Sequence, residues 1–147
     1  MLTTTRNKLS LQSSTAAVFL GLGIFLGGCK SDNFPELAVV QGTVSYKGKL
    51  LTHGEVVFTP KDATLGPQAV GEIQADGSFQ MATLGRPGAA LGKRTVTVHS
   101  RKPLTPKQAK SLVVPESLIP LKYGQAETTP FHFQVSRGTN QCKLEMD

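Results

Sequence analysis

Short runs that alternate between apolar and polar residues, separated by turn-forming residues, constrain the fold of this chain most strongly. Alternation with a period of two is the signature of half-buried β-strands. The predicted strands are residues 39–46, 54–59, 69–73, 79–81, 95–100, 131–135 and 141–146. Seven short strands without a long helical pattern predict an all-β protein, a seven-stranded antiparallel β-sandwich with Greek-key connections. A small closed barrel is the alternative.

Turn and helix signals separate these runs. Asp76-Gly77 is the strongest turn signal and predicts a two-residue hairpin, because glycine adopts a positive φ without steric cost and aspartate tolerates it. The longest connection, a basic crossover over residues 100–128, contains Thr105-Pro106-Lys107-Gln108. This order is typical of a helix start in which Thr105 is the cap and Gln108 reaches back to it. Pro115 limits the helix to a turn or two.

The N-terminal segment predicts export. Arg6 and Lys8 make its start positive, and the 11 residues 16–26 are apolar apart from glycine. That stretch is too short to cross a bilayer as a helix, which needs about 20 residues. It has the length of the apolar part of a helical signal peptide, predicted here as residues 1–28.

The end of this segment predicts lipid attachment. Leu26-Gly27-Gly28-Cys29 resembles the bacterial lipobox, in which a branched apolar residue and two small residues precede a cysteine. The resemblance implies cleavage between Gly28 and Cys29, with diacylglycerol attached to the Cys29 thiol. The alternative is an ordinary signal peptide, or an uncleaved anchor, in which Cys29 has no role.

Removal of 28 of the 147 residues leaves 119, which is enough for one domain with a single core. We predict a lipidated tether over residues 29–37 and a β-sandwich domain over residues 38–147. The predicted location is the cell envelope, facing the periplasm or the cell surface. Lys30, in place of an acidic residue after Cys29, weakly favours an outer membrane.

The mature chain has no internal disulfide to form, because Cys142 is its only thiol besides Cys29. Cys142 alternates with Leu144 and Met146, which favours a buried, apolar thiol. A bridge to another chain and an exposed reactive thiol are the alternatives.

Positive charge is concentrated in residues 93–122, which contain seven basic residues and one acid, Glu116. The rest of the mature chain, with seven basic and nine acidic residues, is net negative. The candidates for contact with anionic lipid headgroups or an anionic envelope polymer are Arg94, Arg101, Lys102, Lys107 and Lys110. A solvated loop is the simpler interpretation. Export, and the lack of aromatic residues among the basic ones, argue against nucleic acid as a partner.

Several short motifs occur in an order that resembles a known family. They are Val40-x-Gly-x-Val-x-Tyr-Lys-Gly-Lys, Gly54-x-Val-Val-Phe-Thr-Pro, Gly71-x-Ile-x-Ala-Asp-Gly-Ser-Phe, Gly92-Lys-Arg-Thr-Val, Ile119-Pro-x-Lys-Tyr and a last strand after Gly138-x-Asn140. Behind a lipobox, this order resembles the small lipoproteins, abundant in Planctomycetes, with a carboxypeptidase-regulatory-like or transthyretin-like domain. The resemblance covers residues 38–146. It implies a transthyretin-like (prealbumin-like) sandwich and carries over no catalytic residue. Cys142 and Leu144 depart from the aromatic residues it leads us to expect.

Metal binding is not predicted. His99 and His132 lie on strand faces opposite the apolar residues and would be neighbours if their strands pair, while His53 precedes a strand. No CxxC, HxH or HExxH spacing occurs, and three or four converging ligands are needed. Asp62 and Asp76 fall in different loops, which disfavours calcium.

Catalysis is not predicted either. No GxSxG or SxxK motif occurs, and Ser78 is accounted for by the turn at Asp76-Gly77. Glu55, Glu72 and Asp76 are the carboxylates that would pair across strands in a glycosidase, but the domain is small for the cleft of such an enzyme.

The sequence therefore predicts a lipid-anchored, non-enzymatic structural or protein-interaction module without a cofactor. The first alternative is a domain that binds a glycan or an anionic polymer. It is disfavoured because exposed aromatic platforms are scarce, with no tryptophan and only Tyr46 and Tyr123. The second, an accessory subunit of an envelope peptidase, rests on the family resemblance alone.

Overall fold

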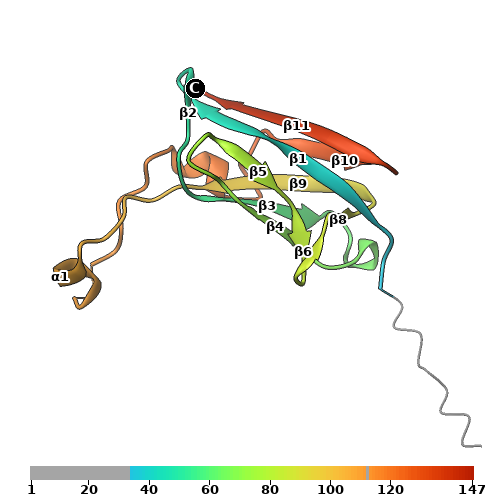
Figure 1. The fold of residues 1–147 in the computed structure, drawn as a ribbon, viewed down its shortest axis with the longest axis horizontal. Coiled ribbons are helices and arrows are strands. Elements are labelled where there is room, and N and C mark those ends of the chain that lie inside the picture. The colour runs from blue at the N-terminus through green and yellow to red at the C-terminus, as the bar shows by residue number, and fades with distance from the viewer. Residues whose placement is uncertain (1–33, 112) are drawn as a thin grey trace, which may run out of the picture. The chain divides into compact units, whose positions relative to one another are not determined.

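The computed structural model describes residues 34–111 and 113–147. The predicted signal peptide, its cleavage site after Gly28 and the lipidation site Cys29 lie outside these residues. Within them, the strands form two sheets that do not close into a barrel, which confirms the predicted all-β sandwich (Figure 1). No helix in the described ranges is long and apolar enough to span a membrane.

The central strand of the first sheet is β1 (Leu37–Tyr46), because every other strand of that sheet pairs with it. Along one edge, β11 (Thr139–Met146) runs parallel to β1. Three short antiparallel strands pair in turn with the other edge: β8 (Ala89–Ala90), β5 (Ser78–Gln80) and β2 (Lys49–Leu50). Both edges of β1 are therefore occupied.

The parallel pairing of β1 with β11 corrects the expectation of a wholly antiparallel sandwich. Antiparallel neighbours can be joined by a hairpin, whereas parallel neighbours need a crossover. β11 follows β10 (His132–Val135), which belongs to the other sheet. The chain changes sheet over residues 136–138 and returns beside β1 in the same direction.

The second sheet has the strand order β10-β9-β3-β4-β6-β7, and all its neighbours are antiparallel. Its other strands are β3 (Glu55–Pro60), β4 (Ala69–Glu72), β6 (Ala82–Thr83), β7 (Arg86–Pro87) and β9 (Gly92–His99). Three short helices lie in the connections: η1 (Ala63–Leu65), α1 (Pro106–Ala109) and η2 (Leu121–Gly124).

All seven predicted strands are present, as β1, β3, β4, β5, β9, β10 and β11, and the described residues contain four more, β2, β6, β7 and β8. Each of these four has two residues, which is too short to show alternation. β5 and β6 are nearly continuous in sequence but belong to different sheets. The chain crosses between the layers at buried Met81, as corner strands of sandwiches do.

Buried apolar side chains from both sheets form one core. On β11, Cys142, Leu144 and Met146 are buried while the residues between them are exposed, as the alternation predicts. Cys142 is 3% exposed, and burial raises the pKa of its thiol to about 12. The predicted buried thiol is confirmed. It is protonated at neutral pH and inaccessible, which removes both alternatives for this fold.

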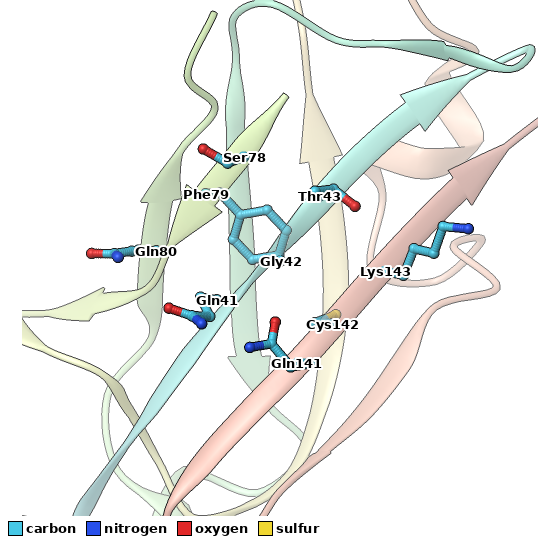
Figure 2. Close-up of a pocket in the computed structure, with 9 residues that line it drawn as sticks. All are labelled: Gln41, Gly42, Thr43, Ser78, Phe79, Gln80, Gln141, Cys142 and Lys143. Carbon is cyan, nitrogen blue, oxygen red and sulfur yellow. The ribbon is translucent and has the colours of Figure 1, made fainter. Parts of the chain in front are cut away.

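Gly42, in the middle of β1, allows the backbones of the first sheet to approach closely. A Cβ atom here would overlap the backbone carbonyl of Cys142 and lie 3.0 Å from the ring of Phe79. Figure 2 shows Phe79 and Cys142 on the two strands that flank this position. Only glycine leaves room for both neighbours.

We therefore expect Gly42→Ala to lower the free energy of unfolding by at least about 2 kcal/mol. This lies in the upper part of the range of about 1–3 kcal/mol that is typical of overpacked cores. Urea denaturation of the purified protein measures it. Thr43→Ala, at the next and exposed position, is the control and should change stability by less than about 0.5 kcal/mol. Equal stabilities for the two variants would contradict the close approach at Gly42.

Two hairpins turn through two residues each, with both residues at positive φ. Lys47-Gly48 joins β1 to β2, and Leu84-Gly85 joins β6 to β7, with φ of 49° at Lys47 and 48° at Leu84. This is the type I′ turn, which favours Asn-Gly. The left-handed region costs an ordinary residue about 1–2 kcal/mol. Leu84 has this cost, and its side chain is 77% exposed.

Leu84→Asn should raise the free energy of unfolding by about 0.5–1 kcal/mol, because asparagine adopts the left-handed region more readily than leucine. The same urea titration measures this gain. Leu121→Asn is the matched control, since Leu121 is 70% exposed but does not have a positive φ. A Leu84→Asn variant no more stable than the unchanged protein would show that the turn is not strained.

Candidate functional site

The long connection after β9 forms a projecting arm, residues 102–116 (Figure 1). Its two legs are joined at the base, where Arg101 and Ser117 form an antiparallel bridge. Beside this bridge, the Lys102 amide donates to the Glu116 carbonyl at 2.8 Å, and the Leu118 amide donates to the Ser100 carbonyl at 2.9 Å. The arm therefore leaves the sandwich through a paired stem.

Helix α1 near the end of the arm is the one that the sequence predicts. The Thr105 hydroxyl accepts a hydrogen bond from the Gln108 amide, and the Gln108 side-chain oxygen accepts one from the Thr105 amide. Pro106 occupies the first helical position. This reciprocal cap satisfies backbone donors without tertiary contacts. The cap and the single turn of helix are confirmed.

The arm combines positive charge with exposed apolar side chains. Lys102, Lys107 and Lys110 are exposed, as is Arg101 at the base. The ion pairs found in the described part of the chain, Arg137–Glu36 and Lys143–Glu145, include none of them. Val113 is 45% exposed and Val114 81%. Exposing this much apolar surface to water is unfavourable in free energy, and a binding partner that covers the valines would remove that cost.

A hollow of about 290 Å³ lies where the arm joins the sandwich. Val114 from the arm and Leu121 from η2 line it, together with Arg101. Leu118 and Leu121, which follow the arm in sequence, are 39% and 70% exposed. The base of the arm thus offers an apolar depression next to a positive charge.

Arg94 is not part of this surface, which corrects its prediction as an anionic-surface contact. Its side chain is 1% exposed. The guanidinium donates to the carbonyls of Ala90 at 2.8 Å and Leu91 at 3.2 Å, and also to those of Leu65 and Pro67. Burial lowers its pKa, but arginine stays charged at neutral pH. Arg94 joins the η1 loop to the start of β9 and is structural.

Arg94→Met should lower the free energy of unfolding by about 2–4 kcal/mol, because several buried carbonyls would lose their donor. Urea denaturation measures the loss. Lys102→Met, which removes an exposed charge of the same sign, should change stability by less than about 0.5 kcal/mol. If both variants were equally stable, the assignment of Arg94 to the interior would be wrong.

The structure places His99 and His132 apart. β9 and β10 do pair, but His132 lies opposite Thr95 rather than His99. His99 is instead opposite Glu55, which is also opposite Glu72.

A hollow of about 730 Å³ is lined by His99, Glu55 and Glu72, together with His53. The pairing considered for Glu55 and Glu72 is therefore present, without Asp76. Two of the groups have structural partners: His53 Nε2 lies 3.1 Å from the Arg101 carbonyl and donates to it, and the His99 ring packs against Gly124. Over residues 34–111 and 113–147, no group of three His, Cys, Asp or Glu side chains is placed to hold a metal ion.

The two aspartates weighed for calcium are held by local hydrogen bonds. Asp76 accepts from the amide and the hydroxyl of Ser78, at 2.9 and 2.6 Å, and these bonds lower its pKa. Asp62 accepts from the Thr64 amide at the start of η1, which likewise lowers its pKa. The predicted turn is confirmed, with Ser78 in it, but the predicted hairpin is wrong: β4 and β5 on its two sides belong to different sheets, and Asp76 does not have a positive φ.

A polar hollow of about 350 Å³ crosses the first sheet (Figure 2). Six polar side chains border it in two rows, Gln80, Gln41 and Gln141 in one and Ser78, Thr43 and Lys143 in the other. Phe79 also borders it but is 1% exposed. The hollow thus presents amides and hydroxyls without the aromatic platform on which sugars usually stack.

The sequence predictions missed the structural role of Arg94, although a signal for it exists. Arg94 has the same parity as Val96 and Val98 on β9, so alternation places all three on the buried face. They also missed the contacts made by residues 34–36, since single contacts between distant segments leave no periodic pattern.

Comparison with protein-family models, with curated proteins and with solved structures finds no match to this chain.

Proposed function

We propose that this protein is a lipid-anchored module of the bacterial cell envelope that docks a protein partner through its arm and catalyses no reaction. The observation that carries the proposal is the composition of the arm: exposed lysines with no ion-pair partner among the described residues, beside exposed Val113 and Val114. The location rests on the sequence from Leu26 to Cys29, where cleavage and acylation are proposed.

The absence of catalysis is supported by how the candidate groups are used. The thiol of Cys142 is buried and its pKa is raised, so it is no nucleophile at neutral pH. Ser78 donates to Asp76 within a turn, and His53 donates to a backbone carbonyl. Each of these groups is occupied by a structural contact.

A protein fits the arm better than a glycan does. Sugars usually stack on exposed aromatic rings, but Tyr123 is 3% exposed and Tyr46 is partly buried against the core. Exposed valines gain affinity by being buried against apolar side chains, and lysines around them favour an acidic partner and speed its association. We therefore propose a partner whose surface combines carboxylates with apolar side chains.

The stem gives the arm a defined direction. Its backbone hydrogen bonds and the His53–Arg101 contact hold the base against the end of β9. A docking element held in place loses less conformational entropy on binding than a free loop does. The fixed direction of the arm therefore favours a docking element over a solvated loop.

Crosslinking in cells, followed by mass spectrometry, tests the proposal. The variant carries Lys102→Glu, Lys107→Glu and Lys110→Glu, and the control carries Lys47→Glu, Lys49→Glu and Lys61→Glu. All six lysines are exposed, and each variant replaces three of them, so both variants change the net charge by the same amount. We expect one recurring protein partner, lost by at least about tenfold in the arm variant, equivalent to about 1.4 kcal/mol.

Val113→Ser with Val114→Ser tests the apolar half of the contact separately, and the same loss of the partner is expected. Retention of the partner in both arm variants would contradict docking through the arm. Capture of lipid or wall polymer alone would contradict the protein partner and favour a domain that binds an anionic polymer.

A further inference from the structure

Leu84-Gly85 forms the tip of the β6–β7 hairpin. The backbone conformation and the solvent exposure at position 84 both disfavour leucine. Leu84 is in the left-handed region and is 77% exposed. Single exposed leucines are common on protein surfaces and by themselves indicate nothing. What distinguishes Leu84 is its position relative to the point where the chain enters the domain.

The first described residues are held against the same hairpin. The guanidinium carbon of Arg86, two residues after Leu84, lies 4.1 Å from the centroid of the Phe34 ring. Glu36 accepts from Arg137 through both carboxylate oxygens, at 3.0 and 3.1 Å, and its carbonyl accepts from the Leu91 amide. Residues 34–36, predicted as part of the lipidated tether over residues 29–37, are therefore attached to the domain.

The chain length between this attachment and the proposed lipid site is short. Four residues, 30–33, separate Cys29 from Phe34. Five Cα-to-Cα steps span at most about 17 Å, and Leu84 is within about 7 Å of Arg86 along the chain. An acylated Cys29 would therefore keep the hairpin tip within reach of the headgroup layer.

We infer that the β6–β7 tip contacts the lipid surface in which Cys29 is anchored, with Leu84 entering the boundary between headgroups and acyl chains. The inference rests on the proposed acylation of Cys29. Burial of the leucine in this boundary explains an apolar side chain at a strained, exposed turn. Arg86 stands beside it, where its guanidinium can donate to lipid phosphates. The anchor and the tip together give the domain two points of attachment.

The arm and the anchored end lie at opposite ends of β9. Glu36 contacts Leu91, just before β9 begins, whereas the arm stem starts just after it ends. Eight residues of strand span about 25 Å. Figure 1 shows the same separation, with α1 far from the start of β1. Leu121, which lines the hollow at the arm base, is therefore a suitable reference position.

Tryptophan fluorescence tests the inference directly, because the chain has no tryptophan of its own. Leu84→Trp and Leu121→Trp are made in the full chain and produced in a bacterium that acylates lipoproteins. Intact mass verifies the acyl group on Cys29. Each variant is reconstituted in phosphatidylcholine–phosphatidylglycerol vesicles, with and without bromine on the acyl chains near the headgroup. Leu121 is 70% exposed, so both substitutions are at similarly open positions.

We expect both variants to float with the vesicles, and bromine to quench Leu84→Trp by roughly half while leaving Leu121→Trp nearly unchanged. Flotation with no quenching at position 84 would overturn the inference and leave the anchor intact. Equal quenching at both positions would overturn it too, because the contact would not be specific to the tip. If the chain produced in this bacterium carried no acyl group by intact mass and did not float, the proposed anchoring would be overturned, and this inference with it.

Discussion

The backbone ladder on both edges of β1 is the interaction on which the rest of this fold depends. β11 pairs with one edge over eight residue pairs, and β8, β5 and β2 share the other. Gly42 makes this arrangement possible by leaving space for Cys142 and Phe79. Because β1 directly follows residues 34–36, a force on the proposed lipid anchor would act on the strand with the most backbone pairing in its sheet.

The basic residues of β9 and the arm show how one cluster of like charges in sequence divides between two roles. Arg94 lies on the inward face of β9, where four different carbonyls surround its guanidinium. Backbone carbonyls solvate a buried cation without adding a second charge, so desolvation is offset with no carboxylate present. The lysines of the arm keep their water and remain available to a partner. Of the five basic residues named as candidate contacts, Arg101 and the three lysines of the arm are therefore the ones at the surface.

The arm and the hairpin tip differ in how far local sequence predicts them. The Thr105–Gln108 cap is a contact between residues three apart, and the sequence predicts it in full. The contact of the Arg86 guanidinium with the Phe34 ring joins segments far apart in the chain, and so does the pairing of Arg101 with Ser117. Nothing within either segment encodes its partner. The basic side chains of the candidate site, apart from Arg94, were accordingly among those named from the sequence, whereas its exposed valines and its shape were not.

The sequence by itself determined the seven main strands, the buried face of β11 and the turn at Asp76-Gly77, because alternation and turn chemistry act over a few residues. It also contained the pattern from Leu26 to Cys29 on which the proposed anchor rests. Only the tertiary structure decided that β1 and β11 run parallel, that Arg94 is interior, and that Arg86 of the β6–β7 hairpin contacts the Phe34 ring. These depend on which strands become neighbours, and that is set by the packing of two sheets around one core, since strand pairing is non-local.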